Sequence, residues 1–153
     1  MFQWALFAGA RAGELPLEQA EAAGEFGRQL GLAFQITDDV LDLEGSLRDL
    51  EKSPLADVRE GKLTYPLIVA AAQEPRLVSM VREIAGLPDG AAVSAGAREA
   101  LLGALERTGG LLEGRARARA HVARAKAALD ALPESPRRTA LLLVSEAAIS
   151  RVG

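Results

Sequence analysis

The amino-acid sequence predicts an all-α fold, and three observations support this class. Residues that favour helices dominate the chain, while the alternating β-branched segments typical of strands are absent. Hydrophobic residues make up 49% of the chain but aromatic residues only 4%, so we expect a core built mainly of Ala and Leu. At 153 residues the chain has the length of one average domain, and we expect a single helical domain over residues 1–153.

Proline and glycine residues divide the chain into the expected helices. The first covers residues 1–12 and ends near Gly13. Pro16 then opens a long helix from about Leu17 to Leu43, because proline is tolerated in a first turn. A glycine and a proline predict a loop over residues 44–54. The remaining helices are expected near residues 63–73, 75–86, 93–108, 111–132 and 135–151.

The segment 111–132 combines alanines with basic residues. Four alanines spaced by four, three and four residues are expected to form its packed face. They are Ala116, Ala120, Ala123 and Ala127. We expect the basic residues between them to face solvent. His121 lies among these residues, so we expect it to be exposed, without a partner and without a catalytic role.

The composition excludes several classes of function. Eighteen Lys and Arg against 21 Asp and Glu give a net charge of −3, which argues against binding to nucleic acid or to an anionic membrane. The absence of cysteine excludes disulfides and thiolate metal sites, and a single histidine excludes zinc sites built from histidine clusters. No apolar segment reaches the length that a membrane helix needs, so we expect no membrane span and a cytoplasmic location.

The long helix carries an acidic face. At about 100° per residue, three carboxylates and one amide share an arc of about 100° on a segment that is otherwise apolar. They are Asp38, Asp42, Gln35 and Asp39. Carboxylates this close repel one another, and a divalent cation compensates that repulsion. Mg²⁺ takes one or two carboxylates and completes its shell with water and phosphate, so we predict a magnesium site here.

The acidic face has two other interpretations. The first is a solvated acidic patch at a helix end, which requires no ligand, and the sequence leaves this alternative open. A calcium loop of the EF-hand type is excluded, because its D-x-[DN]-x-[DN]-G pattern is missing. Three glycines, Gly24, Gly27 and Gly31, fall on the same side of the helix as the aspartates. Each costs about 1 kcal/mol relative to Ala inside a helix, so we expect another group to pack or bind closely there.

Basic residues follow the acidic face in the next connection, namely Lys52, Arg59 and Lys62. Carboxylates cannot hold a phosphate directly, because both groups are anions. A divalent ion bound to the aspartates, with lysines nearby, can hold a diphosphate between them, since lysine acts on phosphate as a point charge. The two segments together therefore predict a diphosphate site.

Two stretches of the chain carry a family resemblance, GLAFQITDDVLDLEG and LEKSPLADVREGKLTYPLI. The pattern FQxxDDxxD followed by DxREGKxTxPL resembles the second aspartate-rich motif and the following lysine segment of the trans-isoprenyl (polyprenyl) diphosphate synthases. The resemblance covers essentially this whole chain but only the C-terminal half of a typical member. It therefore implies the C-terminal helices of an isoprenoid-synthase helical bundle.

This resemblance implies a magnesium-dependent head-to-tail prenyl transfer. In that family an allylic prenyl diphosphate ionises, and isopentenyl diphosphate attacks the resulting cation. The metal ligands implied are Asp38, Asp39 and Asp42. Gln35 would hydrogen-bond the diphosphate, and Lys62 and Lys52 would neutralise the charge of the leaving group, with Gln35 and Lys62 counted as catalytic.

The chain also departs from the family pattern. It contains no second DDxxD, and the residues that bind isopentenyl diphosphate in the family belong to the half that is missing here. The family's Lys-Thr pair aligns with Phe2-Gln3, and Glu51 stands where a glycine usually precedes the lysine. A lone copy of the chain is therefore expected to be unable to complete the reaction.

Three hypotheses follow. The chain is half of a truncated or split synthase, active only with an N-terminal half; or it is a non-catalytic partner that stabilises or regulates a complete synthase; or it is a plain helical bundle with an accidental acidic patch. In the first two cases the missing half leaves a packing face open, so we expect a homo- or hetero-oligomer.

Overall fold

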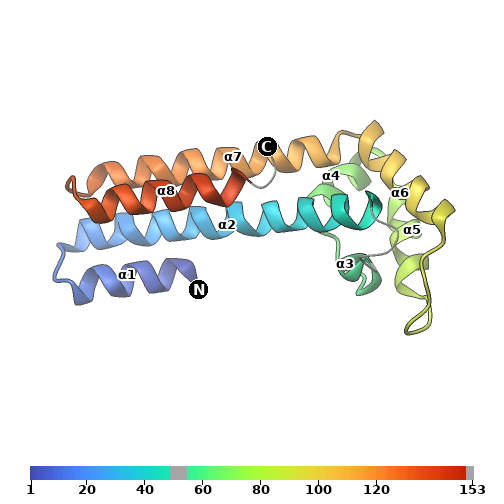
Figure 1. The fold of residues 1–153 in the computed structure, drawn as a ribbon, viewed down its shortest axis with the longest axis horizontal. Coiled ribbons are helices and arrows are strands. Elements are labelled where there is room, and N and C mark those ends of the chain that lie inside the picture. The colour runs from blue at the N-terminus through green and yellow to red at the C-terminus, as the bar shows by residue number, and fades with distance from the viewer. Residues whose placement is uncertain (49–54, 151–153) are drawn as a thin grey trace. The chain divides into compact units, whose positions relative to one another are not determined.

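The computed structural model describes residues 1–48 and 55–150, with side chains for residues 1–45 and 55–150 (Figure 1). Its helices are α1 (Phe2–Ala12), α2 (Leu17–Arg48), α3 (Ala56–Arg59), α4 (Tyr65–Gln73), α5 (Arg76–Ala85), α6 (Ala95–Arg107), α7 (Gly110–Ala128), the 3-10 helix η1 (Leu129–Ala131) and α8 (Pro136–Ser150). These two ranges contain no strand, which confirms the predicted all-α class. None of their helices is both long and apolar enough to cross a membrane.

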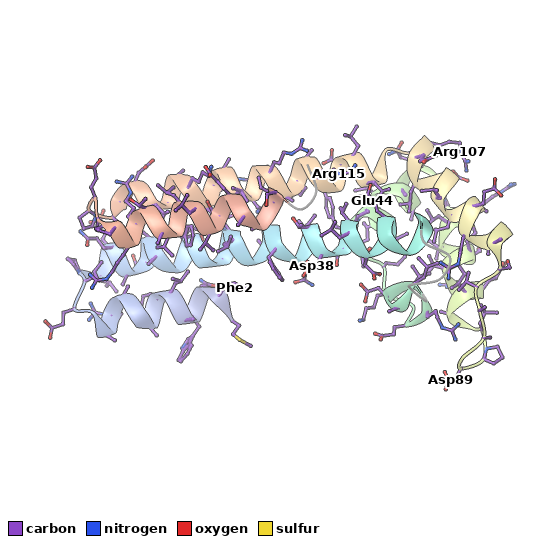
Figure 2. All side chains as sticks on the ribbon, in the orientation of Figure 1. Phe2, Asp38, Glu44, Asp89, Arg107 and Arg115 are labelled. Carbon is purple, nitrogen blue, oxygen red and sulfur yellow. The ribbon has the colours of Figure 1, made fainter. Side chains whose placement is uncertain are left out.

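The helix boundaries follow the predictions closely, with two exceptions. Pro75 and Gly86 flank α5, as their positions predict. The loop predicted from residue 44 is wrong up to residue 48, because α2 continues through Gly45 to Arg48. A single glycine weakens a helix without ending it, and Glu44 pairs with Arg115 of α7, which supports this last part of α2 (Figure 2). The four-residue helix α3 was not predicted.

The chain packs as two compact units. We call Met1–Thr37 together with Ala116–Gly153 the terminal unit, and Asp38–Arg115 the central unit. Both α2 and α7 contribute residues to each unit. The single domain over residues 1–153 stays a prediction.

The terminal unit is built from α1, α8 and the adjoining parts of α2 and α7 (Figure 1). Its core joins Phe26 and Leu30 of α2 with Ala125 and Leu129, which are all buried. Partly buried apolar side chains from α1, from α8 and from the residue after η1 complete this core, among them Leu6, Leu132, Leu141 and Leu142. Burial of these side chains is the main force that holds the four helices together.

Helix α1 packs against the glycine face of α2, which consists of Gly24, Gly27 and Gly31. A Cβ atom added to Gly27 would lie 2.6 Å from the carbonyl oxygen of Phe2 and 2.9 Å from Cδ1 of Leu6. Added Cβ atoms on Gly24 and Gly31 would each lie 3.3 Å from an aromatic side chain of α1. The predicted close packing on this face is confirmed, and the partner is another helix of the same unit.

The packed face predicted for α7 is wrong. In the part of α7 from Ala116 onward the buried residues are Ala118, His121, Val122 and Ala125, followed by Leu129 of η1. By contrast, Ala116, Ala123 and Ala127 are exposed and Ala120 is half-buried. Both sets of apolar residues repeat every three or four positions, so the spacing alone does not select between them. The face that contains Val122 and Leu129 buries larger apolar side chains, and this is the face that packs.

His121 is buried and hydrogen-bonded, so the prediction that it is exposed and without a partner is also wrong. Its ring is 8% exposed, and Nδ1 lies 2.6 Å from Oε1 of Gln29 on α2. Gln29 in turn donates from Nε2 to Glu25 over 2.7 Å, and Arg28 donates to both oxygens of Glu25. The pKa of His121 is lowered by burial first and then by the nearby charges of Arg117, Arg124 and Arg28.

We expect Gly27→Ala to lower the free energy of unfolding by about 1–3 kcal/mol, because the new methyl group overlaps backbone atoms of α1. Gly9→Ala is the matched control in the same unit. Its Cβ meets no atom within 4 Å, so the helix preference of alanine should raise stability by up to about 1 kcal/mol. Urea unfolding measures both variants, and equal stabilities would contradict the close contact.

We expect stability to fall as the pH is lowered from about 7.5 to about 5.5, because the unfolded chain protonates His121 more readily than the folded chain does. The contribution of His121 is present above its ordinary pKa and is lost as the pH falls through its lowered pKa. Urea unfolding at several pH values measures this slope. In His121→Gln the slope over this range should be smaller, and an unchanged slope would show that other groups cause it.

Candidate metal centre

The central unit holds the C-terminal part of α2 against α3, α4 and the start of α7. Val40 and Leu43 of α2 are fully or almost fully buried, and this anchors one side of the helix. A Cβ atom added to Gly114 of α7 would lie 2.8 Å from Val40 and 3.1 Å from Pro66 of α4. The missing side chain at residue 114 therefore lets α2 and α4 meet the same point of α7.

The three aspartates of the acidic face lie on this part of α2. Asp38, Asp39 and Asp42 are each half-buried. Figure 2 shows Asp38 on the side of α2 opposite to Glu44, the residue that pairs with Arg115. That Asp39 and Asp42 share this side of the helix with Asp38 stays a prediction.

Burial and mutual repulsion act on two of these carboxylates. The pKa of Asp42 is raised by burial first and then by the charge of Asp57, while Lys62 opposes the shift. The pKa of Asp39 is raised by burial first and by the charges of Asp57, Asp38 and Asp42, while the backbone N–H of Tyr65 opposes the shift. Within the described residues, Oδ2 of Asp42 is buried without a hydrogen-bond partner.

Asp57 is the functional candidate that the sequence analysis missed. It lies on α3, and its carboxylate accepts a hydrogen bond from Lys62 over 2.9 Å. Glu60 also contacts Lys62, at 2.6 Å, and the two acids raise the pKa of this lysine. The stretch that resembles the family includes Asp57, five residues before Lys62, but the spacing alone gave it no role.

The predicted site residues are therefore brought together only in part. Asp38, Asp39, Asp42 and Lys62 lie in the central unit, whereas Gln35 is an exposed residue of the terminal unit. Lys52 lies outside the described residues. The guanidinium group of Arg59 is engaged elsewhere, because it donates to the carbonyl oxygens of Pro88 and Ala91 and so holds the turn before α6.

The carboxylates of this site suit a cation that keeps part of its hydration shell. Within the described residues, no group of three or more acidic or histidine side chains is arranged to enclose a metal ion. However, Asp42 keeps a buried oxygen without a partner among the described residues, and burial followed by the charge of Asp57 raises the pKa of both Asp39 and Asp42. Mg²⁺ with one or two carboxylates, water and phosphate suits such a site, whereas a cation held by protein atoms alone does not.

We expect Asp57→Asn to lower the pKa of Asp42, because the charge that repels its carboxylate is removed. The pKa should stay above the ordinary value, since burial is the larger cause. Carboxyl carbon NMR over a pH titration measures this shift. Glu60→Gln is the matched control, because Glu60 also contacts Lys62 but is not among the causes of the Asp42 shift. Equal effects of both variants would contradict the assignment to Asp57.

Comparison with known proteins gives a consistent result. Residues 1–97 match the family model described as Polyprenyl synthetase. The chain is 38% identical over 135 residues to the mitochondrial solanesyl-diphosphate synthase 1 of Oryza sativa subsp. japonica, covering 84% of this chain and 30% of that protein. It is 34% identical over 135 residues to the octaprenyl diphosphate synthase of Escherichia coli (strain K12), covering 88% of this chain and 41% of that protein.

Solved structures extend this likeness to nearly the whole chain. The polyprenyl synthase from Caulobacter crescentus CB15, complexed with calcium and isoprenyl diphosphate, is 32% identical with a TM-score of 0.79. The match covers 99% of this chain and 46% of that one. This chain thus spans less than half the length of these three relatives.

Proposed function

Because the chain belongs to the polyprenyl synthetase family and has the fold of the isoprenoid-synthase helical bundle, we propose that it forms half of a prenyl diphosphate synthase site. In this proposal it binds the diphosphate of an allylic substrate through Mg²⁺ and, with an N-terminal half, transfers the prenyl group head-to-tail to isopentenyl diphosphate. The observation that supports the proposal is a buried oxygen of Asp42 that has no hydrogen-bond partner among the described residues, on a carboxylate whose charge Lys62 opposes.

The residues of the central unit have distinct tasks in this proposal. Asp38 and Asp42 hold Mg²⁺, which when bound polarises the diphosphate and so favours its departure. Lys62 stays protonated, because Asp57 and Glu60 raise its pKa. An ammonium group has three hydrogens to donate, and the two acids use two of them, which leaves one for a phosphate oxygen. Lys62 thus neutralises charge that develops on the leaving group.

The other predicted contributions remain part of the proposal. Gln35 donates a hydrogen bond to the diphosphate, and Lys52 adds a second positive charge. Isopentenyl diphosphate binds to residues that an N-terminal half supplies. The relatives' names include solanesyl and octaprenyl diphosphate synthases, so we propose that the product is a long-chain isoprenoid diphosphate. A homo- or hetero-oligomer and a cytoplasmic location stay predictions.

A second candidate function is that of a non-catalytic partner of a complete synthase. The observation that favours it is the exposure of large apolar side chains in the terminal unit, where Trp4 is 73% and Leu143 63% exposed. Exposed apolar surface is typical of sites where another protein packs. In this case the acidic face has no role, and Asp38→Ala would leave the turnover of the partner synthase unchanged.

Calorimetry with inorganic diphosphate tests the proposed function. We expect binding that requires Mg²⁺, and we expect Asp38→Ala to weaken it by about tenfold or more, because one ligand of the cation is lost. Glu83→Ala removes an exposed acid of α5 in the same unit and should leave the affinity unchanged. Absence of Mg²⁺-dependent binding by the unmodified chain would contradict the proposal.

A further inference from the structure

The segment that holds Lys62 has little regular structure of its own. It consists of α3, which has four residues, and a short connection to Tyr65, where α4 begins. A helix of a single turn is not stable in isolation, because fixing the backbone of the first turn is unfavourable. The position of Lys62 within the central unit therefore depends on contacts that α3 makes with other elements.

Apolar packing holds α3 on the central unit. Leu55, directly before the helix, and Val58 within it are both fully buried, and α3 contacts α5. A Cβ atom added to Gly61 would lie 3.7 Å from Cβ of Ala85, the last residue of α5, so the connection after α3 lies close to that helix. Apolar burial is non-directional, however, so it does not by itself fix how a single turn of helix is rotated.

The guanidinium group of Arg59 supplies a directional contact. Arg59 is the last residue of α3, and its Nη2 donates to the carbonyl oxygen of Pro88 over 2.8 Å, while its Nη1 donates to the carbonyl oxygen of Ala91. The planar guanidinium group offers its donors in fixed directions, whereas lysine has one ammonium group on a flexible stem. Two acceptors on one guanidinium group therefore fix the orientation of α3 as well as its position.

Both acceptors belong to the turn between α5 and α6. The carbonyl oxygen of Pro88 also accepts the N–H of Ala91 over 3.0 Å, and Gly90 between them has a φ of +78°, a conformation that favours glycine. Val93, shortly after the turn, is buried. Arg59 thus connects α3 to a turn that is closed by its own hydrogen bond and anchored by a buried residue.

Further hydrogen bonds connect α3 to Lys62. The backbone N–H of Lys62 donates to the carbonyl oxygen of Asp57 over 2.9 Å, and the N–H of Gly61 donates to that of Val58 over 3.0 Å. The ammonium group of Lys62 donates to the carboxylate of the same Asp57 over 2.9 Å. Both the backbone and the charged end of Lys62 are therefore bound to α3, so a rotation of α3 would move them together.

We propose that Arg59 is a positioning residue, which acts on the diphosphate through Lys62 and not through its own charge. This inference rests on the proposed function and gives a task to one of the basic residues that follow the acidic face. By fixing α3 against the turn between α5 and α6, Arg59 holds the ammonium group of Lys62 in place before a ligand binds. A group that is held in advance loses less conformational freedom on binding, which favours affinity.

Two variants of Arg59 separate position from charge. Arg59→Lys keeps the positive charge but removes the planar group that reaches two carbonyl oxygens, whereas Arg59→Gln removes both. We expect each variant to weaken the Mg²⁺-dependent binding of inorganic diphosphate by about threefold or more in calorimetry. Arg82→Gln is the matched control, because it removes an exposed positive charge of α5 in the same unit, and it should leave the affinity unchanged.

A double-mutant cycle shows whether Arg59 acts through Lys62. Lys62→Met alone should weaken the binding by about tenfold or more, because a charge-assisted hydrogen bond to phosphate is lost. When Arg59→Lys is added to Lys62→Met, we expect a further loss of less than about twofold, because the group that Arg59 positions is already absent. A merely structural role, or direct contact between Arg59 and the ligand, would instead make the two losses multiply.

Amide hydrogen exchange of the ligand-free chain, followed by NMR, tests the positioning without any diphosphate. We expect Arg59→Lys to speed exchange at Lys62 and Gly61 by about threefold or more, since the hydrogen bonds of these N–H groups depend on a fixed α3. Exchange at Leu105, a fully buried residue of α6, should stay unchanged, which would show that the unit remains folded.

Three results would overturn the inference. Full affinity in Arg59→Lys would show that Arg59 does not act by position. Independent losses in the cycle would show that it does not act through Lys62, and unchanged exchange at Lys62 and Gly61 would show that it does not fix α3. If Arg59→Gln does not fold, Arg59→Lys still decides each of these points. If the unmodified chain binds no diphosphate, the proposed function fails, and the exchange data still decide whether Arg59 positions Lys62.

Discussion

Electrostatic repulsion among half-buried carboxylates is the constraint on which the candidate site depends. Asp39 and Asp42 lie where burial disfavours their charge, and Asp57 adds further repulsion from α3. Lys62 opposes the charge of Asp42, and its ammonium group is shared with Asp57 and Glu60. A fold tolerates such an arrangement only when packing elsewhere supplies the stability, which is typical of binding and catalytic sites.

That packing relies on close contact between helices. Gly27 lets α1 approach α2 at the distance of backbone contact, and Gly110 and Gly114 let α7 approach α4 in the same way. Short distances between helices allow many favourable contacts between atoms of small residues. The same compact unit contains the carboxylates of α2 and the ammonium group of Lys62, which ion pairs with Asp57 and Glu60 hold.

The sequence predicted the helical class, most helix boundaries and the glycine face of α2, because each depends on local preferences or on the cost of glycine in a helix. It failed for His121, because the partner Gln29 lies 92 residues away in the sequence. It also failed to select the packed face of α7, since two sets of residues have the same spacing. Asp57 was missed because α3 is too short to show periodicity, and its role depends on where the fold places it. The continuation of α2 to Arg48 depends on an ion pair with distant Arg115, which local sequence does not reveal.

The buried contact between His121 and Gln29 has a consequence for how α2 and α7 align within the terminal unit. Polar groups inside an apolar core gain little net stability, but they penalise every arrangement in which their partners are lost. A shift of α7 by one turn along α2 would place the imidazole against hydrocarbon and leave the amide oxygen of Gln29 without its partner. Alanine-rich helices offer few large side chains to prevent such sliding, so His121 and Gln29 select one register out of several that the small side chains alone would permit.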